Sequence, residues 1–153
     1  MTQPRIMIVE ARFYQDLADE MAAGAIAAIE ARGGAYQRFA VPGAFEIPAA
    51  IRFAVQSMDV DESRPRFDGY VALGCVIRGE TTHYDYVCGE SARGLTDLIN
   101  QYSLAVGYGI LTTENREQAW ERASRAAGNK GDAAANACLD MIELKKHFGL
   151  FPR

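Results

Sequence analysis

The chain has 153 residues, of which 49% are hydrophobic and 24% are charged, so it can bury a core and is neither disordered nor fibrous. Its net charge of −4 and its lack of a basic run argue against a nucleic-acid-binding protein. The N-terminal residues have no signal-peptide pattern, and no apolar run approaches the ~20 residues of a membrane span. We therefore expect a soluble, cytoplasmic protein with no membrane partner.

The first strand and the first helix are predicted from apolar periodicity. Residues 6–9 form a short, fully apolar run of the kind found in buried strands. The segment after it predicts a helix that ends at Gly33-Gly34. One face of this helix carries Leu17, Met21, Ala25, Ala28 and Ile29.

A second strand and a second helix follow. Residues 36–41 predict a strand that ends at Pro42-Gly43. The second helix is expected to begin near residues 45–48. Residues 57–66 are polar and include Pro65, so we expect a surface loop there.

The most distinctive stretch, residues 74–85, reads Gly-Cys-Val-Ile-Arg-Gly-Glu-Thr-Thr-His-Tyr-Asp. It follows residues 68–73, which are largely apolar, β-prone and of strand length. Apolar residues after the stretch recur at helical spacing. We therefore expect a strand-to-helix turn in which Gly74 and Gly79 supply backbone freedom.

The start of the next helix offers groups that suit an anion. Thr82 and Asp85 match a Ser/Thr-x-x-acid capping signature, which predicts that the helix begins at His83. Backbone N–H groups, the Thr81 hydroxyl and the His83 imidazole would then surround one point. A helix N-terminus favours an anion there by about 0.3–1 kcal/mol. The alternative is an ordinary capped helix with an exposed histidine in its first turn.

The last third of the chain contains one more strand and two helices. Residues 104–111 predict the strand, and Thr112-Thr113 offers caps for a helix that carries Arg122. Gly-Asn-Lys-Gly at residues 128–131 interrupts this pattern. The final helix is expected over residues 134–147.

Strand and helix thus alternate four times, with an extra helix at the end. This alternation predicts an α/β fold in a single domain over residues 1–153, with a four-stranded parallel sheet and helices on both faces. Ligands of such sheets bind outside the carboxyl ends of the strands. We therefore expect the functional site where residues 10–14, 41–46, 75–83 and 109–113 meet.

The three cysteines do not indicate a disulfide framework or a metal site. Cys75, Cys88 and Cys138 are odd in number and lie in apolar segments, without a Cys-x-x-Cys or Cys/His cluster. We expect buried free thiols in a reducing compartment.

Four motifs occur in order along nearly the whole chain. They are Val-Pro-Gly-Ala-Phe-Glu-Ile-Pro at 41–48, the Arg-Gly-Glu-Thr-x-His core within 74–85, Gly-Ile-Leu-Thr-Thr-Glu at 109–114, and the run from 117 to Gly-Asn-Lys-Gly at 128–131. At this spacing the sequence resembles the lumazine synthase family of riboflavin biosynthesis. Any one motif alone would be weak, whereas the four together are specific.

This resemblance implies a flavodoxin-like domain that acts as a transferase. The implied reaction condenses 5-amino-6-(D-ribitylamino)uracil with 3,4-dihydroxy-2-butanone 4-phosphate, giving 6,7-dimethyl-8-ribityllumazine, phosphate and water. It implies no metal and no redox cofactor. Family members assemble as pentamers, or as 60-subunit shells of pentamers, with each site at the contact between neighbouring subunits. We therefore expect a homopentamer.

The resemblance also implies roles for polar residues. His83 would be the acid/base, because imidazole gives and takes protons near neutral pH. Arg122 would hold the substrate phosphate with a bidentate fork, together with Thr81 and the backbone N–H of Glu80. A solvated helix-face arginine is the alternative for Arg122. Lys130 would add positive potential, although an ordinary turn lysine explains it nearly as well.

Aromatic and acidic residues would bind the other substrate. Phe13 corresponds to the family's aromatic residue that stacks on the pyrimidine ring, and its alternative is a core residue. Tyr14 follows it where the family often has asparagine, which leaves the local hydrogen bonding open. Ala44, Phe45 and Glu46 would bind the ribityl chain and the ring edge through backbone groups and one carboxylate. A structural salt bridge is the alternative for the Glu46 carboxylate.

The remaining predicted contacts come from two strands. Cys75, Val76 and Ile77 would present backbone amides to the uracil, so their side chains matter little. Tyr108 would close the pocket from the neighbouring subunit. Its alternative is an ordinary strand residue packed on the sheet.

Two other functional classes use the same fold. A flavin or lumazine carrier would keep Phe13 and Glu46 but could lose His83 or Arg122; both are present, which favours the enzyme. A shell-forming structural protein is the third class. Residues 124–127 depart from the turn of many shell-forming members, which favours the free pentamer.

Overall fold

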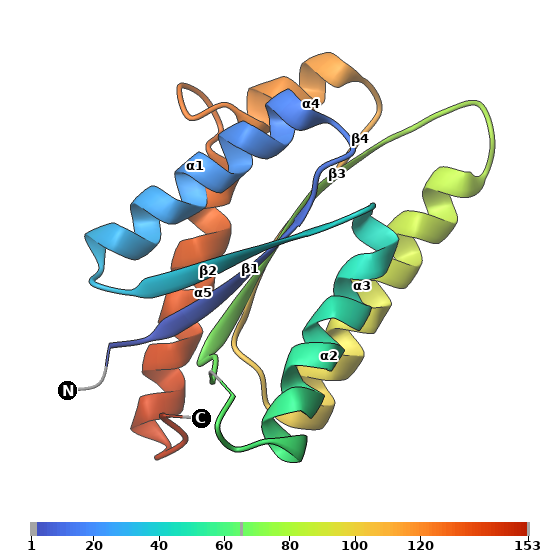
Figure 1. The fold of residues 1–153 in the computed structure, drawn as a ribbon. Helices are drawn as coiled ribbons and strands as arrows, with labels where there is room; N and C mark the ends of the chain where they lie inside the picture. The colour runs from blue at the N-terminus through green and yellow to red at the C-terminus, as the bar shows by residue number, and fades with distance from the viewer. Residues whose placement is uncertain (1–2, 65, 153) are drawn as a thin grey trace.

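The computed structural model describes residues 3–64 and 66–152, and strands alternate with helices along the chain (Figure 1). The strands are β1 (Arg5–Ala11), β2 (Ala35–Val41), β3 (Gly69–Ile77) and β4 (Val106–Thr113). The helices are α1 (Gln15–Ala31), α2 (Ile47–Val60), α3 (His83–Tyr102), α4 (Arg116–Ala123) and α5 (Lys130–His147), and the short 3-10 helix η1 (Ala44–Glu46) precedes α2. None of the helices in this part of the chain is long and apolar enough to cross a membrane.

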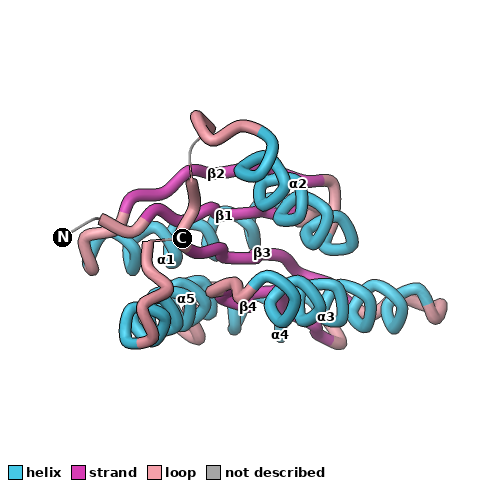
Figure 2. Tube along the Cα trace, turned by 90° about the horizontal axis from the view of Figure 1, so that it is seen from below, coloured by secondary structure: helices cyan, strands magenta, loops and turns pink. Residues whose placement is uncertain are grey.

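The four strands form one parallel sheet in the order β2-β1-β3-β4 (Figure 2). In the centre of the sheet, Ile6 pairs with Tyr36 on one side and with Gly69 on the other. On the far side of β3, Gly74 pairs with Ile110 of β4. This strand order and the flanking helices confirm the predicted three-layer, flavodoxin-like α/β fold.

Helices cover both faces of the sheet, and each face has its own core. Side chains alternate along β1, so Ile6 and Ile8 pack with α1 and α5, whereas Met7 and Val9 pack with α2 and α3. The small helix α4 lies on the α1 and α5 side (Figure 1). The edge strand β2 is more exposed than β1 and β3, so the predicted burial on both faces applies mainly to the two central strands.

Helix α5 lies so close to its neighbours that two positions admit only glycine. A Cβ added at Gly107 of β4 would stand 1.9 Å from the carbonyl oxygen of Ala134. A Cβ added at Gly131 would stand 2.1 Å from the carbonyl oxygen of Met21 in α1. Backbone atoms occupy both places, so a side chain at either position would force the helix away.

Strand β3 is longer than predicted, which corrects the expected turn. The strand continues through Gly74 to Ile77 because these residues pair with the end of β4. The turn therefore begins at Arg78. Neither Gly74 nor Gly79 has a positive φ, so the predicted need for backbone freedom at these glycines was wrong.

The caps of two helices also differ from the prediction. Helix α3 begins at His83 as expected, but the Thr82 side chain makes no capping hydrogen bond. Instead, the backbone N–H of His83 donates to Oγ1 of Thr81 over 3.3 Å. Helix α4 is capped by Asn115, whose Oδ1 accepts from the N–H of Gln118 at 2.9 Å, because Thr112-Thr113 belongs to β4.

Two helix bounds differ as well. Helix α2 extends to Val60, so the predicted loop over residues 57–66 begins only at Asp61. The Pro65 that supported this loop lies outside the described residues. Helix α5 begins at Lys130, earlier than the predicted residue 134, because Asn129 reverses the chain with φ 48° just before it.

Candidate active site

The carboxyl ends of β1, β2 and β3 lie at one edge of the sheet, towards the upper right of Figure 1. Phe13 follows β1, η1 follows β2, and the loop over residues 78–82 follows β3. η1 contacts both β3 and α3, so the segment that contains Ala44, Phe45 and Glu46 lies against the helix that begins at His83. The topology thus gathers most of the predicted site residues at this edge.

Two aromatic rings at this edge are exposed in the single chain. Phe13 is 74% exposed, and Phe45 is 57% exposed. The alternative that Phe13 is a buried core residue is therefore wrong. Large exposed rings near a sheet's ligand-binding edge are suited to contact with a flat, largely apolar partner.

The carboxylate of Glu46 is open to a ligand. The residue is exposed, and it forms no ion pair with any of the residues that the structure describes. Its backbone N–H donates to the carbonyl of Gly43 over 3.2 Å, which fixes the turn. The structural salt bridge considered as an alternative for Glu46 is therefore not formed within this part of the chain. The carboxylate can accept hydrogen bonds from hydroxyl groups.

The last residues of β3 pair on one side only. Pairing of β3 with β1 ends at Leu73, whereas pairing with β4 continues to Ile77. Cys75, Val76 and Ile77 therefore have one strand edge that β1 does not cover, where backbone groups can bind a ligand. Burial raises the pKa of the Cys75 thiol to about 11, so this thiol stays protonated and is a poor nucleophile.

The loop after β3 leads into the first turn of α3. Glu80, Thr81 and His83 are all exposed there. The N-terminus of this 20-residue helix directs backbone N–H groups at the loop, and the N–H of His83 donates to the Thr81 hydroxyl. An exposed imidazole, a hydroxyl and a positive helix end can together hold an anion and exchange a proton with it.

Arg78 is a neighbour of these residues that was not among the predicted site residues. Its Nε donates to Oε2 of Glu114 at 2.8 Å, and its guanidinium lies 4.3 Å from the centre of the Tyr84 ring. Its Nη1 is 3.6 Å from Oδ1 of Asp85. Arg78 thus ties the loop to the end of β4 and to the first turn of α3. Asp85 and Glu114 each lie in one of the sequence motifs, and their carboxylates were the signal that could have identified Arg78.

A separate groove of about 500 Å³ runs along the free edge of β4 and α5. Tyr108, Arg122 and Lys130 line it, and its lining residues include two cations and no carboxylate. Nη1 of Arg122 donates to the Gln118 carbonyl at 3.1 Å, and no described carboxylate pairs with it. This bond joins two residues one turn apart on α4, as expected for the alternative of a solvated helix-face arginine. The rest of the guanidinium remains available for an anion.

The groove and the His83 loop are separate within one chain. Arg122 lies on α4, which packs on the α1 and α5 face, whereas His83 begins α3 on the opposite face. No residue of the loop over 78–83 lines the groove. A single chain therefore does not bring Arg122 to Thr81 as the phosphate assignment requires.

Comparison with known proteins adds an independent finding. The family model described as 6,7-dimethyl-8-ribityllumazine synthase matches residues 3–146. The chain is 58% identical over 144 residues to 6,7-dimethyl-8-ribityllumazine synthase 1 of Rhizobium meliloti (strain 1021), covering 94% of this chain and 93% of that protein. It is 54% identical over 149 residues to the synthase of Agrobacterium fabrum (strain C58), covering 97% and 99%, and 53% identical over 146 residues to that of Bartonella bacilliformis, covering 95% and 93%.

Proposed function

The chain belongs to the 6,7-dimethyl-8-ribityllumazine synthase family, and we propose that it performs the family's reaction at sites shared between neighbouring subunits. The reaction is the condensation of 5-amino-6-(D-ribitylamino)uracil with 3,4-dihydroxy-2-butanone 4-phosphate, a step of riboflavin biosynthesis. The observation that carries the shared site is the separation of the cationic groove from the His83 loop.

The phosphate-bearing substrate would bind between the two halves. Arg122 and Lys130 of one subunit supply positive charge from a groove without carboxylates. Thr81 and the backbone N–H of Glu80 of the next subunit face the phosphate at the N-terminus of α3. Two cations and a helix end together offset the charge of the dianion, which neither half does alone.

The pyrimidine substrate would bind on the half that carries His83. Phe13 stacks on its ring, and backbone groups of Ala44 and Phe45 bind the ribityl chain and the ring edge. Glu46 accepts hydrogen bonds from ribityl hydroxyls, and the uncovered edge of residues 75–77 meets the polar edge of the uracil. Tyr108 of the neighbouring subunit closes the pocket.

Chemistry in this site is mainly positioning. An amine and a ketone react by themselves, so holding them together lowers the barrier by several kcal/mol in favourable cases. His83 adds proton transfer during imine formation, phosphate loss and ring closure. The presence of both His83 and Arg122 favours this enzyme over a flavin carrier with the same fold.

The test measures the absorbance of the lumazine product with both substrates. His83→Ala should lower kcat, by at most the ~10²–10⁴-fold that a placed acid/base contributes, and leave residual turnover above the uncatalysed condensation. His147→Ala is the matched control, because His147 ends α5 among Lys145 and Lys146. Equal turnover in the two variants would show that His83 takes no part in catalysis.

A second pair of variants tests the phosphate site. Arg122→Ala should raise KM for the butanone phosphate more than KM for the pyrimidine, because only the former carries the dianion. Arg125→Ala also removes one positive charge, but from the neighbouring turn, outside the groove lining. It should change neither of the two KM values. Tight riboflavin binding by the wild-type protein with no rate enhancement would instead indicate a carrier.

The assembly and location follow from the same proposal. We infer a homopentamer of single-domain subunits, residues 1–153, because a ring supplies every His83 loop with a neighbour's groove. Mass measurement by light scattering separates the pentamer from a 60-subunit shell. The substrates are small metabolites of riboflavin biosynthesis, and we propose that the enzyme works in the cytoplasm.

A further inference from the structure

A buried carboxylate lies at the end of β1, just before the loop that carries Phe13. Glu10 is only 2% exposed. Its Oε1 accepts from Nη1 of Arg12 at 2.7 Å, and its two oxygens accept from Nη2 and Nε of Arg38 at 2.9 and 2.6 Å. A buried carboxylate needs such partners, because an unpaired buried charge is strongly destabilising.

The two arginines hold different parts of the molecule. Arg38 belongs to β2 and pairs with Ile8 of β1, so its bond to Glu10 ties two strands that the sheet already joins. Arg12 follows β1 and precedes Phe13, so its bond to Glu10 ties the connecting loop to the sheet. Only the second bond acts on the segment that presents the exposed ring.

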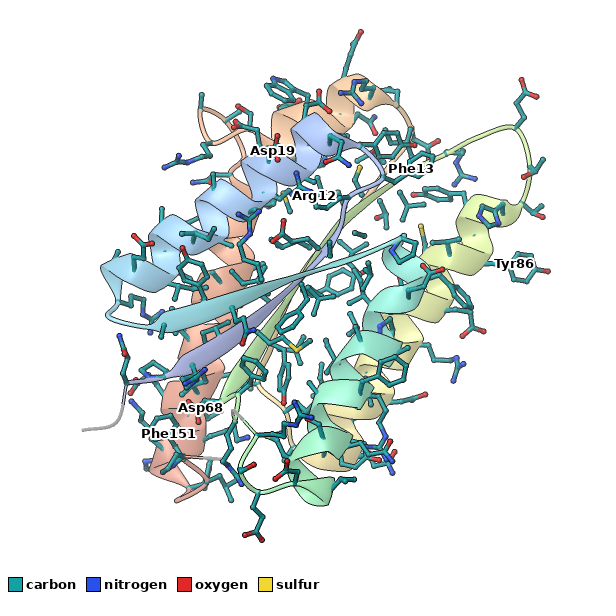
Figure 3. All side chains as sticks on the ribbon, viewed as in Figure 1. Arg12, Phe13, Asp19, Asp68, Tyr86 and Phe151 are labelled. Atoms are coloured by element: carbon teal, nitrogen blue, oxygen red, sulfur yellow. The ribbon has the colours of Figure 1, made fainter. Side chains whose placement is uncertain are left out.

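Arg12 is held from several sides. Besides Glu10, its guanidinium donates to Oδ1 of Asp19 and, through Nε, to Oε1 of Gln15 at 3.2 Å. Nε2 of Gln15 donates back to the Arg12 carbonyl at 2.9 Å. Figure 3 shows Arg12 and Asp19 at the start of α1 with Phe13 beside them on the connecting loop. Two guanidiniums thus meet two carboxylates, and the cluster is neutral.

The other side of Phe13 is held by its neighbour. The ring of Tyr14 meets the Phe13 ring edge-on, with centroids 5.0 Å apart and planes at 83°. Tyr14 itself packs on the α1 and α5 core, and the guanidinium of Arg116 lies 5.9 Å from its ring centre. The exposed Phe13 therefore lies between two anchored residues rather than on a free loop.

We propose that Glu10 and Arg12 are positioning residues that hold Phe13 in place to stack on the pyrimidine substrate. This proposal rests on the stacking role that the proposed function gives to Phe13. Glu10 is buried and cannot reach a substrate, so its effect is transmitted through Arg12. An aromatic ring that is already held loses less freedom when the substrate binds, which favours affinity.

The central test compares two arginines bonded to the same carboxylate. Arg12→Gln leaves Glu10 paired with Arg38, and Arg38→Gln leaves it paired with Arg12. Neither variant therefore leaves the buried carboxylate without a cationic partner. Arg12→Gln should raise KM for the pyrimidine substrate about tenfold, since small misplacements of a binding group have effects of this size or larger. KM for the butanone phosphate and the thermal midpoint should change as little as in Arg38→Gln. Equal pyrimidine KM values in the two variants would overturn the proposal.

Three more variants separate the possible explanations. Glu10→Gln should raise the pyrimidine KM in the same direction as Arg12→Gln and add little to it in the double variant, because both act on one contact. An effect of Arg12→Gln that Glu10→Gln does not reproduce would overturn the role proposed for Glu10, because Asp19 and Gln15 would then be enough to hold Arg12. Phe13→Ala tests the underlying role: if it leaves the pyrimidine KM unchanged, the stacking assignment fails. If only Phe13→Ala raises KM, stacking stands and the positioning proposal fails.

Discussion

The separation of His83 from Arg122 predicts complementation between two defective subunits. His83→Ala lacks the acid/base, and Arg122→Ala lacks the phosphate ligand. In a ring that mixes the two variants equally, a site is intact only where an Arg122→Ala subunit supplies the loop and a His83→Ala neighbour supplies the groove. Half of the subunits are of each kind at both positions, so about a quarter of the sites are restored.

The assay co-expresses the two variants with different tags, isolates mixed rings and measures lumazine formation at low butanone phosphate. Activity should reach about a quarter of wild type, well above the sum of the two parents. Wild type mixed with the His83→Ala/Arg122→Ala double variant is the control, and it should also reach about a quarter rather than a half. Mixed rings no more active than their parents would show that both residues act within one subunit.

Three further predictions concern stability. Asn115→Ala removes the cap of α4 and should lower the free energy of unfolding in urea by about 1 kcal/mol, and an unchanged midpoint would contradict the cap. Gly107→Ala should lower the free energy of unfolding by about 1–3 kcal/mol or more, because its Cβ would meet the Ala134 carbonyl. Gly89→Ala is the control in the same denaturation assay: its Cβ would meet no neighbouring element within 4 Å, so it should be neutral or stabilise α3. Burial raises the pKa of Cys75 from 9.0 to about 11, so the stability that this thiol contributes is complete below pH ~9 and is lost as the pH rises towards 11. Thermal midpoints over this pH range should fall less steeply for Cys75→Ala, and parallel curves would refute the link.

Much of the fold could be predicted because its signals are local. Apolar runs and helical periodicity in residues 6–34 identify β1 and α1 within a few residues, since a strand and a helix each impose their own spacing on buried side chains. The start of α3 at His83 was equally predictable. Errors occurred where pairing between distant segments decides: β3 reaches Ile77 only because the end of β4 lies beside it.

The site followed the same division. The motifs predicted His83, Phe13 and the 44–46 segment as site residues, and the parallel sheet brings these residues to one edge. The polar partners behind them were missed. Glu10 and Arg12 are two residues apart at a strand end, which places both side chains on one face and was the available signal. The third partner, Arg38, comes from another strand.

The sequence by itself determined the order of the elements, the parallel α/β class and the chemistry of the residues at the strand ends, because these depend on spacing and residue type along the chain. Only the tertiary structure decided that Phe13 is exposed and anchored, that Glu10 is buried between two arginines, and that Arg122 and His83 lie on opposite faces. Those properties arise from contacts between residues far apart in sequence. Packing on a shared sheet selects such contacts, and no local pattern encodes them.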